Sequence, residues 1–250
     1  MEENQKVAWC TSMSPSDYDY FMKMKAAGVR AAVINLTLGL GCWNERAMDQ
    51  MMAAKMAGMT ISPFHLSIMD PFFVDEEMVA FSERLRFFDF DAGNVTLALM
   101  PTFKLTRARN TQLINQMVTA LRATGDYTVD ICVQVEDLAD GRIAPEDLAD
   151  PVNLTVINYD DDDAGYPGTG TWIYANEFAG QRQLLGVDFY QHYTAPARPF
   201  DHANGVYIAQ EGDSWRLVAF QHGMAVRDLL RMNSAHETDE IKPGQWINVA

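Results

Sequence analysis

The sequence lacks the features that mark several classes of protein. Its three cysteines, Cys10, Cys42 and Cys132, are odd in number and scattered, which argues against a disulfide framework and a cysteine-rich zinc site. No apolar run is long enough to span a membrane, and the polar stretch Met1–Lys6 has no hydrophobic region of a signal peptide. Cations are scarce: 19 Lys and Arg stand against 34 Asp and Glu, and the net charge of −15 disfavours nucleic acid and anionic membranes as partners. No glycine-rich phosphate loop follows the first apolar run, so we expect no nucleotide, no other cofactor and no metal.

The 250 residues, 48% of them hydrophobic, are enough for a large core, and their pattern indicates its architecture. From residue 6 to about residue 135, short apolar runs alternate with helical patterns such as Leu113 to Leu121, whose apolar residues follow the period of a helix. This βαβα order predicts parallel strands covered by helices. The five predicted strands of this half are Val7–Cys10, Val29–Ile34, Thr60–Phe64, Val95–Met100 and Ile131–Val135.

Later apolar runs come faster and have no full helices between them. They are Val152–Ile157, Thr171–Tyr174 and Leu185–Phe189, and they bring the total to about eight strands. The count predicts an α/β fold, a (β/α) barrel of the TIM type with a simplified second half, over residues 1–197. An open doubly wound sheet is the structural alternative. The proline-bearing stretch Thr194–Phe200 is the expected domain boundary.

The residues after this boundary, 205–250, predict a second, small α+β domain with the order strand, helix, helix, strand. Trp215, Val218 and Ala219 form the inner face of its first helix, which Gly223 ends. This segment resembles a LysM domain, and the resemblance implies binding to chains of N-acetylated glucosamine-type sugars such as peptidoglycan or chitin. The features that carry the resemblance are Gly212-Asp213-Ser214, His222-Gly223, Leu229-Leu230, Asn233 and Ile241-Lys-Pro-Gly-Gln245.

The LysM resemblance also implies where a sugar would lie, in a shallow groove between the loop after the first strand and the loop after the second helix. Backbone amides there can satisfy an acetamido group. Trp215 is either an apolar platform for a pyranose ring or part of the core, and the sequence leaves both readings open. The expected sugar-binding residues are Gly212, Asp213, Ser214, Trp215, Asn233 and Ile241.

The first two hundred residues resemble, distantly, the lysozyme-like barrels of glycoside hydrolase family 25. The segment from Ala27 to Gly39 is similar to the family's second strand, and the segment from Ala57 to His65 to its third strand. Thr171–Tyr174, followed by Gly186–Asp188, is similar to its closing strands. The resemblance implies a muramidase-type fold.

The resemblance also identifies acidic positions that this chain has lost. Glycoside cleavage requires a pair of carboxyl groups, and the family carries an Asp on the first strand, Asp-x-Glu on the fourth and an Asp on the last. Here Ala8 stands at the first position and Met100 and Thr102 at the second pair, so that only Asp188 remains. Because methionine and threonine cannot hold a proton near neutral pH, the resemblance predicts a barrel without the inherited mechanism.

Other acidic residues could still supply catalysis, and Glu136, after the fifth predicted strand, is the candidate beside Asp188. We therefore expect a non-catalytic, peptidoglycan-binding protein, a component of a phage particle or of a cell-wall assembly with possible protein partners. The alternatives are an active muramidase and an assembly scaffold. A sugar-binding barrel cleft without cleavage would be formed by His65, Asn35, Asn158, Tyr174 and Asp188.

Overall fold

The computed structural model describes residues 5–90, 92–150, 152–159, 161–194, 206–209, 212–222, 226–233, 235–236 and 238–249. The chain divides into two units, one of residues 1–148 and 153–196 and the other of residues 149–152 and 197–250. The predicted boundary at 195–200 and the predicted helix end at Gly223 lie outside the described residues. Within the described part, no helix has the length and apolar character needed to cross a membrane.

Eight strands of the first unit close into a barrel, which confirms the predicted fold. The sheet has nine strands, and β1 pairs with both β2 and β9, so the ring closes; the short β3 (Cys42–Trp43) pairs only with β2 and stands outside it. The eight barrel strands are β1 (Gln5–Cys10), β2 (Val29–Leu38), β4 (Thr60–Ser67), β5 (Ala92–Leu99), β6 (Asp126–Gln134), β7 (Asn153–Ile157), β8 (Thr171–Phe178) and β9 (Gln181–Asp188).

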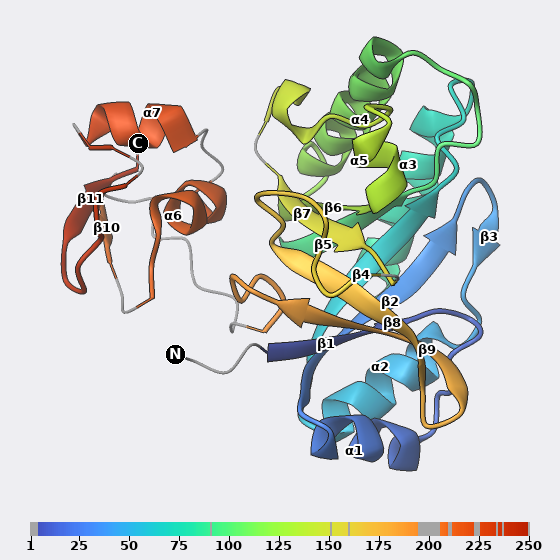
Figure 1. Ribbon diagram of the computed structural model, residues 1–250. Helices are drawn as coiled ribbons and strands as arrows, with labels where there is room; N and C mark the ends of the chain where they lie inside the picture. Colours follow the sequence, from blue (N-terminus) through green and yellow to red (C-terminus); the bar gives the residue numbers. More distant parts are fainter. Residues whose placement is uncertain are drawn as a thin grey trace. The chain divides into compact units, whose positions relative to one another are not determined.

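A helix follows each of the first five barrel strands, and Figure 1 shows these helices around the outside of the barrel. Side chains cap two of them: the Asp17 carboxylate accepts the Tyr20 N–H at the start of the first helix, and the Thr106 hydroxyl accepts the Arg109 N–H at the start of the fourth. In the fourth helix the predicted apolar face, including Leu113, Met117 and Leu121, is buried. The helices are α1 (Tyr18–Ala26), α2 (Ala47–Met56), α3 (Val74–Phe87), α4 (Arg107–Arg122) and α5 (Val135–Ala139), and a 3-10 turn, η1 (Pro145–Asp147), follows them.

The second half of the barrel is simpler, as predicted. The described residues between β7 and β9 contain no helix, and β8 and β9 lie uncovered at the front of Figure 1. β8 turns directly into β9 through Ala179 and Gly180, which have φ of 51° and 73°. Positive φ at two adjacent residues is typical of tight hairpin turns. As a result β9 runs antiparallel to both β8 and β1.

The direction of the parallel strands distinguishes the two ends of the barrel. We call the end where the parallel strands finish, after Cys10, Leu99 and Gln134 among others, the mouth, and the end where they begin, the base. The barrel interior is filled by side chains that alternate along each strand with outward-facing ones. The buried members of this interior cluster are Val7, Trp9, Ala31, Val33, Phe64, Ala98, Cys132, Ile173 and Tyr193.

The second unit has the predicted order of strand, helix, helix, strand. β10 (Val206–Ile208) pairs antiparallel with β11 (Trp246–Asn248), and α6 (Trp215–Gln221) and α7 (Val226–Met232) lie between them in the chain. Its small core contains residues of both helices and of the segment before β11: Ala209, Trp215, Val218, Ala219, Leu229, Ile241 and Ile247.

Candidate functional site

The first barrel strand contributes no carboxylate to the mouth. Val7 and Trp9 belong to the interior cluster, so Ala8 between them faces outward, where it is fully buried. A side chain that is to reach the mouth from this strand has to come from Trp9 or from Thr11 just beyond it. The match of Ala8 with an inward-facing acidic position is therefore corrected by one residue, but no acid stands at any of these positions.

The fourth barrel strand, β5, also delivers no acid. Met100 and Thr102 follow its end, and their backbone N–H groups donate to the carbonyls of Ser67 and Ile68 in the neighbouring strand and loop. The Thr102 hydroxyl donates to the same Ile68 carbonyl over 2.9 Å, and the Met100 side chain is 45% exposed. At this part of the mouth the chain offers a thioether and an already engaged hydroxyl.

Asp188 lies at the base of the barrel rather than at the mouth. Because β9 is antiparallel, its last residue pairs with Gln5 and Thr171, the first residues of β1 and β8. Its carboxylate accepts the backbone N–H groups of His192 at 3.0 Å and Tyr193 at 2.8 Å, and both the N–H and the hydroxyl of Thr194 at 3.2 Å. Burial raises its pKa although these hydrogen bonds oppose the shift. The residue holds a turn, which corrects the expectation of an acid at the mouth.

A second interior carboxylate, Asp130, was not anticipated because it sits inside the apolar pattern of β6. It accepts hydrogen bonds from the Tyr193 hydroxyl at 2.5 Å and the Asn153 amide at 2.6 Å. The Tyr193 hydroxyl also lies 2.9 Å from the Thr96 hydroxyl. Desolvation by burial raises the pKa of Asp130 to about 7. Tyr193 thus closes the interior of the barrel from the base.

His65 does not point into the barrel. Its neighbours Phe64 and Leu66 pack in the interior cluster, while its own ring stacks on Phe81 of α3. Its Nδ1 lies 2.8 Å from the Thr37 hydroxyl and its Nε2 lies 3.1 Å from the Glu77 carboxylate, which also accepts the Ser67 hydroxyl at 2.6 Å. His65 and Glu77 are almost fully buried, so this network joins the barrel wall to α3 and corrects the expected cleft position.

The other expected cleft residues make contacts within or beside their own strands. The Asn35 amide donates to the Thr37 carbonyl, and the Asn158 amide donates to the carbonyl of Asp163. Tyr174 packs its ring against Trp172, and burial raises its pKa. Because Asp188 lies at the base and the His65 ring stacks on α3, these two residues do not share a cleft at the mouth with the other three.

Glu136 lies in the first turn of α5, directly after β6, so it stands on the mouth side and is exposed. Its neighbour Asp137 is buried and its carboxylate lies 2.7 Å from the Arg142 guanidinium.

Among the described residues, no three His, Cys, Asp or Glu side chains form a group that could hold a metal ion.

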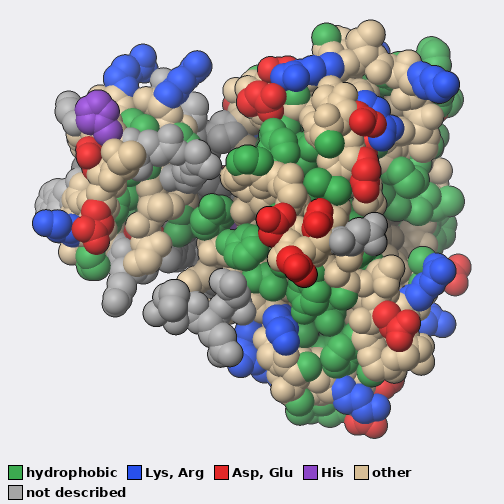
Figure 2. Space-filling view, in the orientation of Figure 1, with side chains coloured by type: hydrophobic (Ala, Val, Ile, Leu, Met, Phe, Trp, Pro, Cys, Tyr) green, Lys and Arg blue, Asp and Glu red, His purple; other side chains and the backbone are tan. Residues whose placement is uncertain are grey.

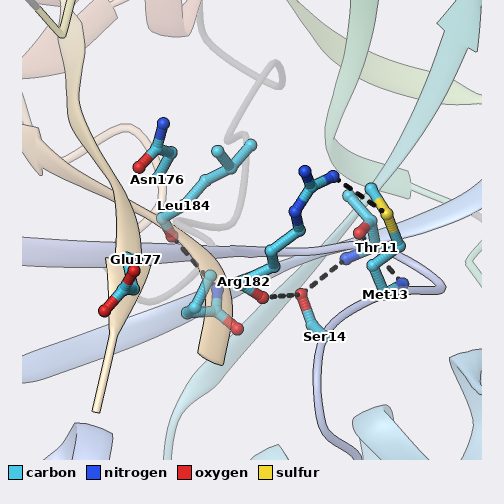
Figure 3. A pocket seen from close by; sticks show the side chains of 8 residues that line it. Thr11, Met13, Ser14, Asn176, Glu177, Arg182 and Leu184 are labelled. Atoms are coloured by element: carbon cyan, nitrogen blue, oxygen red, sulfur yellow. Dashed lines mark hydrogen bonds between the residues drawn. The ribbon is translucent and has the colours of Figure 1, made fainter. Parts of the chain in front are cut away.

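A pocket of about 460 Å³ opens at the mouth beside β1 and the β8–β9 hairpin. Figure 3 shows Asn176 and Glu177 coming from β8, Arg182 from β9, and Met13 and Ser14 from the loop after β1. Glu177 is the single acidic residue among the pocket's lining residues, whereas glycoside cleavage requires two carboxyl groups. Sequence reasoning missed this pocket because it treated 175–184 as the gap between two apolar runs. The hairpin turn Ala179-Gly180 was the available signal.

The second unit assigns structural roles to most of the expected sugar-binding residues. Trp215 is 3% exposed and Ile241 is 7% exposed, so both are core residues, and the reading of Trp215 as an open platform is wrong. The Asn233 amide donates to the carbonyls of Leu229 and Asn248, which joins the end of α7 to β11.

The other expected sugar-binding residues, Gly212, Asp213 and Ser214, lie in the loop before α6. Gly212 has a φ of 87°, which favours glycine, and is exposed. The Asp213 carboxylate accepts the Tyr207 hydroxyl at 2.6 Å, and the Ser214 hydroxyl caps α6 by accepting the Leu217 N–H. The Trp215 indole N–H donates to the carbonyl of Asp239 over 2.9 Å and so ties this loop to the one after α7.

On the face shown in Figure 2, basic side chains lie mainly toward the upper and lower edges of the barrel unit and do not form a continuous surface.

Comparisons with known proteins agree with both halves of this description. The family model for the LysM domain matches residues 207–250. The chain is similar to a bacterial lysozyme from Streptomyces coelicolor, with a TM-score of 0.61 and 14% identity over 74% of this chain and 92% of that one. It is similar to a family 25 glycosyl hydrolase from Bacillus anthracis, with a TM-score of 0.59 and 12% identity over 78% and 96% of the two chains.

A third similar structure is the modular autolysin LytC from Streptococcus pneumoniae in complex with a synthetic peptidoglycan ligand. Its TM-score is 0.62 at 12% identity, over 75% of this chain and 47% of that one. No curated protein sequence matches the chain. Residues 207–250 are therefore a LysM domain, and the unit before them has the barrel fold of the glycoside hydrolase family 25 lysozymes.

Proposed function

We propose that this protein binds peptidoglycan, or a related N-acetylglucosamine-containing glycan, through its LysM domain, and that its barrel does not hydrolyse the glycan. The observation that carries the proposal is the LysM domain at residues 207–250. The similarity of the barrel to LytC, whose structure holds a synthetic peptidoglycan ligand, supports the same class of ligand.

The loops of the LysM domain support a groove made mainly of backbone. Since Trp215 and Ile241 are buried, the groups open to a sugar are the exposed loop with Gly212 and Ser214 and the loop after α7. The hydrogen bond from the Trp215 indole to the Asp239 carbonyl holds these two loops at a fixed separation. Trp215 is thus a positioning residue, while backbone N–H and C=O groups contact the acetamido groups.

The absence of hydrolysis rests on the chemistry of the mouth. At the ends of the first and fourth barrel strands stand Thr11, Met100 and Thr102, none of which can act as an acid or a base near neutral pH. Asp188 is engaged at the base, and Glu177 is the single carboxylate lining the pocket at the mouth. One carboxylate cannot divide the roles of proton donor and nucleophile or base.

A single shallow groove binds weakly, so retention on the wall gains from repetition in an assembly or from a second binding site. A phage particle component or a wall-associated adaptor meets this condition, and either would place the protein at the cell wall. The competing functions are an active muramidase and a protein scaffold that ignores sugar. They differ from the proposal in one observable each: hydrolysis and glycan binding.

The proposal is tested by sedimentation of the full-length protein with insoluble peptidoglycan. We expect the protein to sediment, and removal of residues 205–250 to reduce sedimentation strongly. A protein that stays in the supernatant would support the scaffold instead.

Substitution of Trp215 tests how the groove is held. Trp215→Phe keeps an aromatic ring in the core but removes the indole N–H that donates to Asp239, so we expect retention about three- to tenfold weaker in a folded domain. Val218→Ile, a change in the same core that leaves the two loops tied, is the control. Equal retention of Trp215→Phe and the unaltered protein would show that the two loops need no such tie.

A further inference from the structure

The pocket at the β8–β9 hairpin, introduced above, is bordered by segments of chain that are hydrogen-bonded to one another. The Ser14 hydroxyl accepts the Thr11 N–H at 3.1 Å and donates to the Arg182 carbonyl at 3.4 Å, which fastens the loop after β1 to the hairpin. From the other side the Gln50 amide of α2 donates to the carbonyls of Thr11 and Ser14. Gln183 is buried, and its amide donates to the carbonyl of Trp9. These contacts connect the loop after β1 to the hairpin and to α2.

The charged groups that line this cavity are not paired with each other. Glu177 and Arg182 face each other in register across the hairpin, yet no ion pair joins them. The Arg182 guanidinium contacts the sulfur of Met13 at 3.5 Å, as Figure 3 shows, and within the described residues no carboxylate is paired with it. Both Glu177 and Arg182 are exposed, so each can meet a charged group of a ligand.

The lining combines two charges of opposite sign with four uncharged polar residues and two apolar ones. Arg182 offers a planar guanidinium suited to a carboxylate, and Glu177 offers a carboxylate suited to an ammonium group. Asn176 supplies both a donor and an acceptor for a peptide group. Met13 and Leu184 contribute apolar surface for a short side chain or a methyl group.

We propose that this pocket binds a peptide that carries both a carboxylate and an ammonium group. The choice of peptide rests on the proposed function: it is the free stem peptide of peptidoglycan. Its carboxylate pairs with Arg182 and its ammonium group pairs with Glu177. The barrel then reads the peptide while the LysM domain reads the glycan. The two sites together provide the repetition that a single weak groove lacks.

The proposal is tested by isothermal titration calorimetry on the full-length protein. The probes are a stem tetrapeptide with a lysine at its third position, the same peptide with its carboxylates amidated, N-acetylmuramic acid, and chitotetraose as a neutral glycan. Arg182→Gln is compared with Arg109→Gln, which removes an exposed arginine of α4 that bonds Gln112 outside the pocket.

We expect the tetrapeptide to bind, and Arg182→Gln and amidation each to weaken binding about tenfold. Glu177→Gln weakens it about threefold, because an ammonium is a point charge and cannot make the two parallel hydrogen bonds that a guanidinium makes with a carboxylate. Arg109→Gln leaves tetrapeptide binding unchanged, and Arg182→Gln leaves chitotetraose binding unchanged.

Equal tetrapeptide binding by Arg182→Gln and the unaltered protein would overturn the proposal, as would the absence of tetrapeptide binding. N-acetylmuramic acid binding as tightly as the tetrapeptide would overturn the peptide assignment, because that sugar has a carboxylate but no ammonium group. If the tetrapeptide binds and the protein fails to sediment with peptidoglycan, the proposed function fails while the pocket assignment stands.

Discussion

The two ends of the barrel use acidic residues in opposite ways. At the base, Asp130 and Asp188 are buried and accept hydrogen bonds from Tyr193, from Asn153 and from the turn after β9. At the mouth, the ends of the first and fourth barrel strands present uncharged side chains, among them Met100. The interior carboxylates of this barrel are thus located where they stabilise the fold.

An acidic residue that matches the family therefore indicates catalysis only when the direction of its strand places it at the mouth. An acid on a parallel strand of a TIM-type barrel reaches the mouth when it lies at the end of the strand. Asp188 also lies at the end of its strand, but β9 is antiparallel, so the same position in the element lies at the base. The barrel can therefore keep an aspartate that matches an acidic position of the family without placing it where it could take part in glycoside cleavage.

The largest effect is expected from removing the acid at the base. Asp188→Ala leaves three buried or half-buried backbone N–H groups without their acceptor, so we expect the free energy of unfolding to fall by about 3–5 kcal/mol. Chemical denaturation followed by circular dichroism measures the change. Asp162→Ala, in the exposed loop after β7, is the matched control and should change stability by less than about 0.5 kcal/mol. Equal effects of the two substitutions would remove the distinction between the two ends.

The next effect is a pH dependence that belongs to Asp130. Its pKa is raised from 3.8 to about 7 in the folded protein, so the folded state favours the neutral carboxyl group. The stabilisation is fully present below about pH 4 and is lost as the pH rises through 7. Asp130→Asn removes this dependence. The free energy of unfolding of the variant minus that of the unaltered protein should therefore rise by about 2–4 kcal/mol between pH 4 and pH 8.

The Asp130→Asn variant has to be compared with the unaltered protein because His192 titrates as well. Burial lowers the pKa of His192 to about 3, which destabilises the folded protein as the pH falls below 6.5. Since both proteins contain His192, the difference between them isolates Asp130. A difference that does not vary from pH 4 to pH 8 would show that Asp130 keeps its ordinary pKa.

The smallest effect is expected from adding an acid at the mouth. Met100 is 45% exposed, so Met100→Asp should lower the free energy of unfolding by less than about 1 kcal/mol. Thermal and chemical unfolding measure this. The contrasting variant is Ala98→Asp, two residues earlier in the chain and in the interior cluster, which should fail to fold. A cost at Met100 as large as that at Ala98 would mean that this part of the mouth is a closed core.

Much of the fold could be predicted because its signals are local. All eight predicted barrel strands overlap observed ones, since apolar runs bounded by helical patterns and glycines are properties of short stretches of chain. The LysM domain was predictable for a related reason, because its cues form an ordered series within one short segment.

The site was less predictable because it depends on facing and direction. His65 stands one residue from interior side chains, and a shift of one position in a strand moves a side chain to the other face. Trp215 has the same local pattern whether it is core or platform, and only its burial separates the two readings. Glu177 and Arg182 approach one pocket because a two-residue turn folds β8 back on itself, which no apolar pattern reports.

Whether the barrel hydrolyses glycan is measured by the release of reducing ends when the full-length protein is incubated with purified peptidoglycan from pH 4 to pH 8. We expect no release above that of the buffer, while the same sample sediments with the peptidoglycan. Release that Glu136→Gln or Glu177→Gln abolishes would show instead that the protein is an active muramidase.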